Sequence, residues 1–458
     1  MKIGLVVLTV ATLVTTGCAG FQSGSTGLTP STVNLNHIHG NAHGGQNPIS
    51  TGAVQVYQAG TTGYGTGATA LIPGGSYYAG GATGCVTSPL QVCYSNVVTD
   101  TNGNFDITGL YSCASGSQVY LTVTGGNTGN GVNNASLIMA GLGLCDNVPS
   151  IPFIEVNEVT AVGTVWALSP FMSDVGGVIG VGAPSTNQAG LVEAFADINT
   201  LVSYAAGSSP GTAVPVGATV PSQEIFAIAN SLAACINSSG VGGVCGTLFG
   251  YTTVNGTTPT DVIGAAIDMA RYPAQNASNI LMLASAEAPF ASTFNASTVN
   301  DLTLAVSYTG GGLNSPSALA IDGSGNVWVA NSGNSSVSEF GNKGTALSGT
   351  NGYTAGSISS PSAITIDTAG HVWVANAGNA TLTELSSTGT NVGSSPFSGG
   401  GLSGLASISI DMLGDVWVAN YSNSSVSEFS PTGTAMSGTS GFTATGLSSP
   451  FGVAINPK

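Results

Sequence analysis

Hydrophobic and polar positions follow one pattern three times in the last third of the chain. An apolar strand ends in Ile-Asp, a turn containing glycine follows, and a second strand reads Val-Trp-Val-Ala-Asn. These second strands contain Trp328, Trp373 and Trp417, which lie 45 and 44 residues apart. A period of this length with turn residues at fixed offsets is typical of β-propeller blades. We therefore expect residues 299–458 to form three blades and the start of a fourth.

The fourth copy of the pattern begins at Ser449-Pro450 and extends to Asn456, which takes the place of Asp322 in the first copy. Three blades and one inner strand are fewer than the smallest closed propeller needs. The ring is then either part of a longer gene product, which we favour, or open and completed by other segments or copies.

Alternating apolar and polar positions predict a second β-rich region nearer the N-terminus. Residues 53–57 and 119–124 alternate as half-buried strands do, and Asn102-Gly103 lies between two further apolar runs as a hairpin signal. We expect a β-sandwich over residues 49–150. Residues 19–48 show no hydrophobic period and are rich in Gly, Ser, Thr and Asn, so they are expected to form a flexible tether.

Between residues 151 and 298 the hydrophobic period becomes helical. Helix starts are expected near Asn157, Gly190, Ser222, Asp261 and Asn276. These helices predict a compact α-helical domain without a recognisable catalytic motif. The expected fold is multidomain and mainly β: a β-sandwich, then an α-helical domain, then incomplete β-propeller blades.

The first 18 residues have the pattern of an export signal. Met1-Lys2 precedes a short apolar run, which is too short to span a bilayer and ends in Thr15-Thr16-Gly17-Cys18. A small residue before cysteine is similar to the bacterial lipoprotein cleavage site, which implies that Cys18 carries the lipid. The alternative is an ordinary signal peptide cleaved near Ala19-Gly20. The first places the chain at the outer membrane or cell surface, and the second makes it periplasmic or secreted.

Cysteine usage favours export as well. Without Cys18 an even number of cysteines remains, which in an exported chain suggests disulfides. Pairing of neighbours in sequence gives Cys85–Cys93, Cys113–Cys145 and Cys235–Cys245, although other connectivities are possible. No pair has the CxxC spacing of a zinc or redox site.

Composition restricts the partners. The chain has 4 Lys and Arg against 20 Asp and Glu, for a net charge of −16. So few cations argue against nucleic acid and against electrostatic docking on anionic lipid, which leaves the Cys18 lipid as the expected membrane contact. A hydrophobic content of 42% argues against a disordered chain despite the 68 glycines.

Two segments resemble known families. The core Ile-Asp-x-x-Gly-x-Val-Trp-Val-Ala-Asn, with Ser-Val-Ser-Glu-Phe after it, resembles the NHL-repeat and streptogramin-lyase-like propellers of bacteria. Gly52 to Val56 and Asp100 to Phe105 resemble the strand and hairpin of carboxypeptidase-regulatory-like (collagen-binding B-type) modules. The order of segments is similar to that of a group of bacterial surface proteins. These resemblances imply fold and location more than activity.

Polar clusters offer limited chemistry. His37, His39 and His43 have ligand-like H-x-H spacing, but they lie in the expected tether without a carboxylate partner, so we predict a solvated linker and no metal site. The segment from Asp100 to Asn104 is similar to the start of a calcium-binding loop. It lacks the further carboxylates of such a loop, so we predict a hairpin turn.

The repeated residues have structural and functional interpretations. A ring of carboxylates from Asp322, Asp367 and Asp411 could hold a cation, yet an aspartate before such a turn more often accepts bonds from the turn backbone. The repeat tryptophans, Trp328, Trp373 and Trp417, are expected between blades rather than on a ligand-stacking face.

Catalysis has little support in the sequence. A lyase of the streptogramin type would need a metal-supported His and Glu set, but His371 is replaced by Asn326 and Asp415 in the other repeats. Glu339, Glu384 and Glu428 recur by blade position. We predict no catalytic residue and no cofactor.

Two functions follow from this reading. The first is a non-catalytic surface or periplasmic lipoprotein whose propeller and sandwich faces bind a protein, peptide or glycan. The alternative is a streptogramin-lyase-like propeller enzyme whose catalytic blades are absent from this chain.

Overall fold

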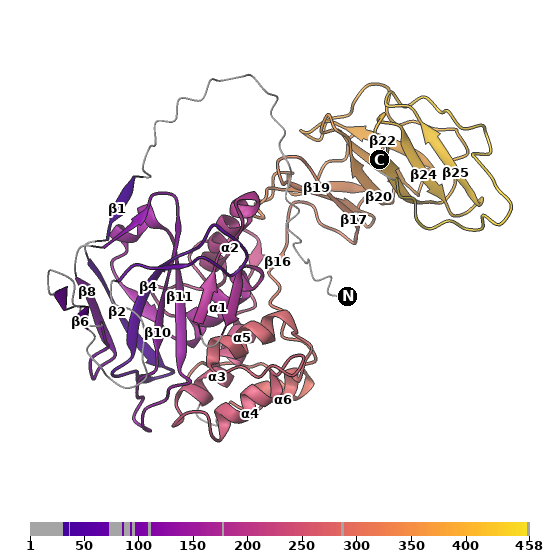
Figure 1. Ribbon diagram of the computed structural model, residues 1–458. Helices are drawn as coiled ribbons and strands as arrows, with labels where there is room; N and C mark the ends of the chain where they lie inside the picture. The colour runs from indigo at the N-terminus through magenta and orange to yellow at the C-terminus, as the bar shows by residue number, and fades with distance from the viewer. Residues whose placement is uncertain are drawn as a thin grey trace. The chain divides into compact units, whose positions relative to one another are not determined.

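The computed structural model describes residues 31–35, 37–72, 85–86, 92–93, 97–108, 111–175, 178–284 and 288–455 (Figure 1). The signal peptide, Cys18 and Asn456 lie outside these residues. The described residues divide into two compact units. The N-terminal unit lies within Met1–Val214 and Thr219–Ser307, and the blade unit within Pro215–Ala218 and Tyr308–Lys458.

The N-terminal unit contains small sheets rather than one extended sheet. The first four-stranded sheet has the order β11-β10-β4-β5, formed by Leu137–Leu144, Gln118–Thr124, Ala53–Gln58 and Thr69–Ala70. In the second, β2 (His37–Gly44) pairs with β3 (Asn47–Pro48), β8 (Asn104–Thr108) and β12 (Ile154–Val156). The two-stranded pairs are β1 (Thr32–Asn34) with β9 (Ser112–Ala114), β6 (Cys85–Val86) with β7 (Val92–Cys93), and β13 (Met172–Val175) with β14 (Val178–Val181). The short strands β15 (Ala218–Thr219) and β16 (Ser307–Tyr308) lie where the chain passes between units.

The structure corrects the expected tether over residues 32–48, which form β1, β2 and β3. Strand β2 lies between β8, which is antiparallel to it, and β12, which is parallel. The sequence hides this strand because its central residues are glycine, asparagine and alanine rather than β-branched residues. Glycine is needed at position 40, because a side chain there would collide with the carbonyl oxygen of Ile154.

The middle of the chain is helical, with α1 at its centre (Figure 1). The helices are α1 (Glu158–Leu168), α2 (Gln188–Leu201), α3 (Ser222–Ile236), α4 (Val244–Tyr251), α5 (Val262–Arg271) and α6 (Ala277–Leu281). Asn157 caps α1 and forms a capping box with Thr160, and Asp261 caps α5. Helix α1 is buried along most of its length and contacts β11, α2, α3 and α5.

The helices share one hydrophobic core with the sheets. Side chains of β4, β10 and β11 belong to the same buried cluster as those of all six helices. The predicted boundary between residues 150 and 151 therefore crosses this core, because the alternating strands bury one face against the helices. Within the described residues, no helix combines the length and apolar character needed to cross a bilayer.

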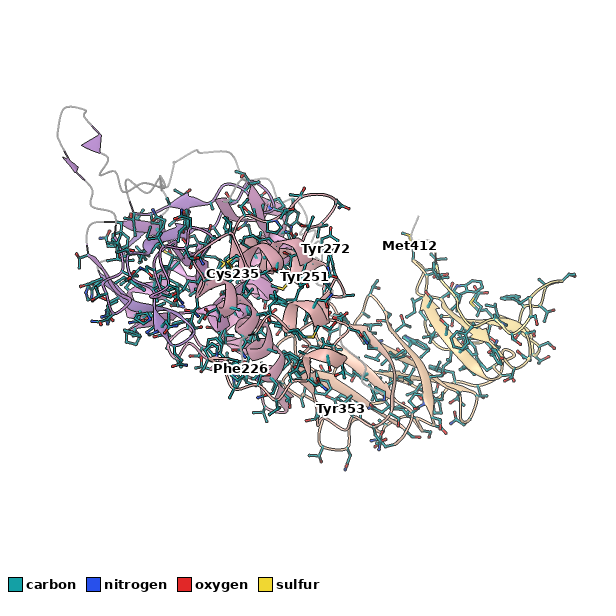
Figure 2. The ribbon with its side chains drawn as sticks, turned by 90° about the horizontal axis from the view of Figure 1, so that it is seen from below. Phe226, Cys235, Tyr251, Tyr272, Tyr353 and Met412 are labelled. Atoms are coloured by element: carbon teal, nitrogen blue, oxygen red, sulfur yellow. A yellow bond between two sulfur atoms is a disulfide. The ribbon has the colours of Figure 1, made fainter. Side chains whose placement is uncertain are left out.

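Disulfides close two loops of this unit. Cys113 and Cys145 are joined, and so are Cys235 and Cys245, as pairing of sequence neighbours predicts (Figure 2 labels Cys235). Cys85 and Cys93 are register partners in β6 and β7, but their side chains lie outside the described part of the structure. Two disulfides suggest an extracytoplasmic protein.

The blade unit confirms the repeated three-stranded pattern. The first blade has the strands β17 (Pro316–Ile321), β18 (Val327–Asn331) and β19 (Ser336–Phe340). The second has β20 (Pro361–Ile366), β21 (Val372–Asn376) and β22 (Thr381–Leu385), and the third has β23 (Leu405–Ile410), β24 (Val416–Asn420) and β25 (Ser425–Phe429). Each is an antiparallel sheet in strand order, with a register shift at the start of its inner strand.

The repeat tryptophans pack between successive blades. Trp328 lies in a buried cluster with residues of the second blade, including Ile364 and Val374. Trp373 occupies the same place against Leu405 and Val418 of the third blade. Trp417, in the third blade, is only half-buried. Trp328 and Trp373 therefore link their own blades to the next one.

One carboxyl in the N-terminal unit lies in an unusual environment. Glu158 is the first residue of α1, and none of its surface is exposed. The Gly45 N–H donates to both of its oxygens, at 3.1 and 2.9 Å. Burial outweighs this bond and raises the pKa of Glu158 to about 8. The folded state therefore keeps a proton that the unfolded chain releases near pH 4.5, and stability falls as the pH rises from 4.5 to about 8.

We predict that Glu158→Gln removes this loss of stability, because glutamine keeps an acceptor for Gly45 without a titrating proton. Urea unfolding followed by circular dichroism, which reports the helices, should show the wild type losing up to about 1.4 kcal/mol per pH unit. The exposed Glu193→Gln of α2 is the matched control and should keep the wild-type dependence. Parallel curves for wild type and Glu158→Gln would contradict a buried, protonated Glu158.

Candidate functional site

The same turn connects the inner and middle strands of every blade. In the first blade, the Asp322 carboxylate accepts hydrogen bonds through Oδ1 from the backbone N–H groups of Ser324, at 2.8 Å, and Asn326, at 2.9 Å. The fourth residue is Gly325 with a φ of 81°, a conformation that favours glycine. Asp367 and Asp411 accept the equivalent backbone bonds in the other blades.

Each of these aspartates also accepts a hydrogen bond from the indole of a tryptophan in the same blade. The indole Nε1–H groups of Trp328, Trp373 and Trp417 donate to Oδ2 of their blade's aspartate at 3.1, 3.3 and 3.0 Å. The bond from Trp417 lowers the pKa of Asp411, as expected for a donor to the charged form. The repeated carboxylates thus serve the turn and the indole.

The turn also occurs in the N-terminal unit. Asp100 accepts from the backbone N–H groups of Asn102 and Asn104, both at 2.8 Å, and Gly103 has a φ of 79°. The Asn104 side chain donates to Asp100 Oδ2 at 3.1 Å, the same distance as from Asn326 to Asp322. The Asp-x-x-Gly-x sequence therefore encodes a turn whether or not a blade follows.

A glutamate from the outer strand completes the arrangement in the first blade. Glu339 pairs in register with Trp328 and is buried, with 4% of its surface exposed. Asn326 Nδ2 donates to Asp322 Oδ2 at 3.1 Å and to Glu339 Oε1 at 3.3 Å, and the Tyr353 hydroxyl donates to Glu339 Oε2 at 2.8 Å. Burial raises the pKa of Glu339, and burial together with the bond to Glu339 raises the pKa of Tyr353 to about 12 (Figure 2 labels Tyr353).

The second blade keeps both carboxylates but changes their partners. His371 Nδ1 lies 2.9 Å from Glu384 Oε1 and 3.5 Å from Asp367 Oδ2, and the three ligand-type atoms all lie within 4.8 Å of one another. Phe397 stacks on Trp373 where Tyr353 stacks on Trp328, so the stacked ring supplies no hydroxyl to the Glu384 carboxylate. Glu384 is 5% exposed, and burial raises its pKa although His371 opposes the rise. This set of donor atoms is the candidate functional site.

The third blade places a carboxylate at the position of His371. Asp415 joins Asp411 and Glu428, and Phe442 stands where the first blade has Tyr353. Partial burial, together with the negative charges of Asp415 and Asp411, raises the pKa of Glu428. The turn is open to solvent at Met412, which is 73% exposed (Figure 2). The three blades therefore share a backbone and differ in the groups that face the glutamate.

A second polar cluster lines a hollow of about 620 Å³ in the N-terminal unit. His37 Nε2 lies 2.7 Å from Asp106 Oδ1, and the rings of His37 and His39 are 5.0 Å apart. His39 Nδ1 is buried without a hydrogen-bond partner among the described residues. His43 faces elsewhere, with Nδ1 2.7 Å from Glu155 Oε1. The expected solvated linker is corrected, because two of these histidines have carboxylate partners from distant segments.

Sequence reasoning missed the set formed by Asp367, His371 and Glu384. In the sequence, Glu384 stands out only as a residue that recurs by blade position, and His371 has Asn326 and Asp415 as its counterparts in the other repeats. The signal was present in the repeats themselves. His371 and Phe397 replace Asn326 and Tyr353 together, so the neutral donors of both carboxylates change in the same blade.

Comparisons with known proteins concern the blade unit. The NHL repeat family matches residues 313–340, which contain the first blade. No curated protein matches the chain in sequence. The family match thus covers the first of the three blades.

Solved structures resemble about a quarter of the chain. A streptogramin B lyase is 16% identical, covers 28% of this chain and 41% of its own, and has a TM-score of 0.22. A catalytically inactive virginiamycin B lyase from Staphylococcus aureus with quinupristin is 16% identical, with 26% and 39% covered and a TM-score of 0.20. A protein of unknown function from Bacteroides caccae is 18% identical, with 26% and 44% covered and a TM-score of 0.21. The chain spans less than half the length of each.

The two carboxylates of the third turn give a matched test of the structural role. Asp411→Ala removes the acceptor for two backbone N–H groups and an indole, whereas the Asp415 carboxylate accepts no hydrogen bond from the described residues. We predict that Asp411→Ala lowers the unfolding free energy by about 1–3 kcal/mol and that Asp415→Ala does not lower it. Tryptophan fluorescence during denaturation reports the blade unit in a Trp166→Phe background, because the other three tryptophans lie in the blades. Equal losses in the two variants would contradict the assignment.

Proposed function

We propose that this chain is an exported, non-catalytic binding protein held by a lipid on Cys18 at a bacterial surface or in the periplasm. The apolar start of the chain, the cysteine after it and the two disulfides support export. The shortage of cations supports a partner other than nucleic acid.

The observation that carries the non-catalytic part is the use of the repeated polar groups. Asp322, Asp367 and Asp411 each accept backbone and indole hydrogen bonds, and Glu339 accepts bonds from Asn326 and Tyr353. A general acid or base must be able to reach a substrate proton. Groups that are occupied by the fold do not meet this requirement.

An exposed apolar strand supports a binding role for the blades. Leu319 in β17 is 48% exposed, whereas Ile364 and Ile408 at the same register in the next blades are 7% and 8% exposed. Ile321 on the same strand is 50% exposed. The face of the first blade that carries Leu319 and Ile321 is thus an exposed apolar surface. The second and third blades bury the equivalent of Leu319, and a protein partner could bury it here. Clusters of exposed apolar residues of this kind are typical of interaction sites.

The N-terminal sheets supply a second face under this proposal. Their strand and turn sequences resemble the carboxypeptidase-regulatory-like modules, and the hollow beside His37 and His39 is lined by polar and aromatic side chains. A peptide or glycan fits such a surface, because its polar groups can pair with imidazole and carboxylate while Phe105 and Phe153 contact its apolar parts.

The alternative is a streptogramin-lyase-like enzyme whose catalytic blades are absent from this chain. It predicts that a protein in which this chain is continued past Lys458 consumes quinupristin, the compound with which one of the similar structures was solved. We predict that the product of the reading frame continued past Lys458, once purified, leaves quinupristin unchanged, as followed by chromatography beside the Staphylococcus aureus lyase as positive control. Loss of quinupristin in proportion to this protein's concentration would contradict the non-catalytic assignment.

Processing of the N-terminus tests the location. In a bacterial host we predict a mature chain that begins at Cys18, carries a diacylglyceryl mass and sediments with membranes. Cys18→Ala should release the chain, whereas Ser23→Ala, a polar change nearby, should leave it attached. Mass spectrometry of the mature N-terminal peptide decides, and an unmodified terminus after Ala19 or Gly20 would contradict lipid attachment.

A further inference from the structure

We propose that the turn of the second blade binds a divalent transition-metal cation, for which Zn²⁺ is the probe, through Asp367 Oδ2, His371 Nδ1 and Glu384 Oε1. This proposal is independent of lipid attachment and of partner binding. It rests on the geometry of the three atoms, on the burial of the carboxylates and on the comparison with the other two blades.

The spacing of the three atoms fits a small cation. Tetrahedral zinc with ligands at about 2.0–2.1 Å separates neighbouring ligand atoms by roughly 3.3 Å. The imidazole Nδ1 lies 2.9 Å from Glu384 Oε1 and 3.5 Å from Asp367 Oδ2, on either side of that value. All three atoms lie within 4.8 Å of one another. A cation can therefore be held with small changes of side-chain torsion.

The balance of charge and donors favours a cation. In the first blade, an amide from Asn326 and a hydroxyl from Tyr353 donate hydrogen bonds to the two carboxylates. The second blade has Phe397 in place of that tyrosine, and Glu384 Oε2 accepts no hydrogen bond from the described residues. Two carboxylates in a largely buried site repel each other unless a positive charge lies between them. A divalent cation compensates both, whereas an imidazolium compensates one.

The fold holds the ligands in place before a cation binds. Asp367 Oδ1 accepts from the backbone N–H groups of Ala369 and His371, which leaves Oδ2 directed at the imidazole. The Trp373 indole donates to Oδ2 at 3.3 Å, a partner of the kind that orients ligating carboxylates in metal sites. Glu384 lies on β22 opposite Trp373, and its backbone N–H donates to Ser395. Pre-organisation of this kind reduces the cost of binding.

The other two blades act as internal controls. Asn326 satisfies the carboxylates of the first blade by hydrogen bonds, so that blade needs no cation. The third blade offers three carboxylates without an imidazole, and its Glu428 is half exposed to solvent, where water screens the charges. A soft-to-intermediate cation that prefers nitrogen together with oxygen should therefore select the second blade alone.

Calorimetric titration of the mature chain with Zn²⁺ tests the proposal. His371→Asn with Phe397→Tyr rebuilds the first-blade arrangement in the second blade, so the fold should be kept. We expect this double variant to lose one equivalent of Zn²⁺, or to bind it more than about 10-fold more weakly. His37→Asn with His39→Asn removes the two neighbouring imidazoles of the hollow in the N-terminal unit and should leave that equivalent in place.

A second variant keeps the test valid if the double variant does not fold. Glu384→Gln keeps a hydrogen-bond acceptor for His371 but removes a ligand charge, and it should weaken Zn²⁺ binding with an unchanged circular dichroism spectrum. Equal Zn²⁺ binding by wild type and both blade variants would overturn the proposal. So would a wild type that binds no Zn²⁺, since His371 would then act only as a hydrogen-bond donor, as Asn326 does.

Discussion

The hydrogen bond from a tryptophan indole to the carboxylate of the preceding turn holds the blade unit together. The aspartate that accepts it also ties down the turn backbone through its other oxygen, so one side chain fixes both the turn and the position of the indole. With its nitrogen satisfied, the ring can be buried against the next blade, as Trp328 is against Ile364. The same residue pair thus sets the strand connection, the orientation of the ring and the contact between blades. Because each of the three blades needs this pair, the aspartate and the tryptophan are identical in all three repeats, whereas many other positions differ.

This constraint decides where function can lie. A carboxylate that accepts hydrogen bonds from the fold is poorly placed to act as a general acid or base, so the repeated residues alone point away from an active site. Chemistry belongs instead to the positions at which one blade departs from its neighbours. His371 is such a departure, because it alone places an imidazole between two carboxylates. Phe397, whose counterpart in the third blade is Phe442, supplies no hydroxyl of the kind that Tyr353 donates to Glu339 in the first blade. Leu319 is a departure of another kind, because its apolar character matches Ile364 and Ile408 but its side chain is exposed where theirs are buried.

The sequence predicted the blades, the helical middle segment and two disulfides, because each depends on a local pattern. Period, glycine turns, the Asn157 and Asp261 caps and the cysteine spacing all act over a few residues. It did not predict β2, whose residues have low strand propensity and become a strand only between β8 and β12, which come from distant parts of the chain. It also missed the site around His371, because Glu384 comes from a strand 13 residues further on and reaches the imidazole only through the pairing of β21 and β22. Features that depend on a few neighbouring residues can be predicted from the sequence, whereas contacts between strands that are distant in the chain cannot.

Anomalous diffraction at the zinc edge, from crystals of the mature chain grown with Zn²⁺, tests most directly the claim that repeated residues are structural and that the departure is functional. The account predicts an anomalous peak in the second blade, within bonding distance of Asp367, His371 and Glu384, and no peak at the equivalent turns that contain Asn326 and Asp415. Peaks of equal height at all three turns, or none at the second, would contradict it.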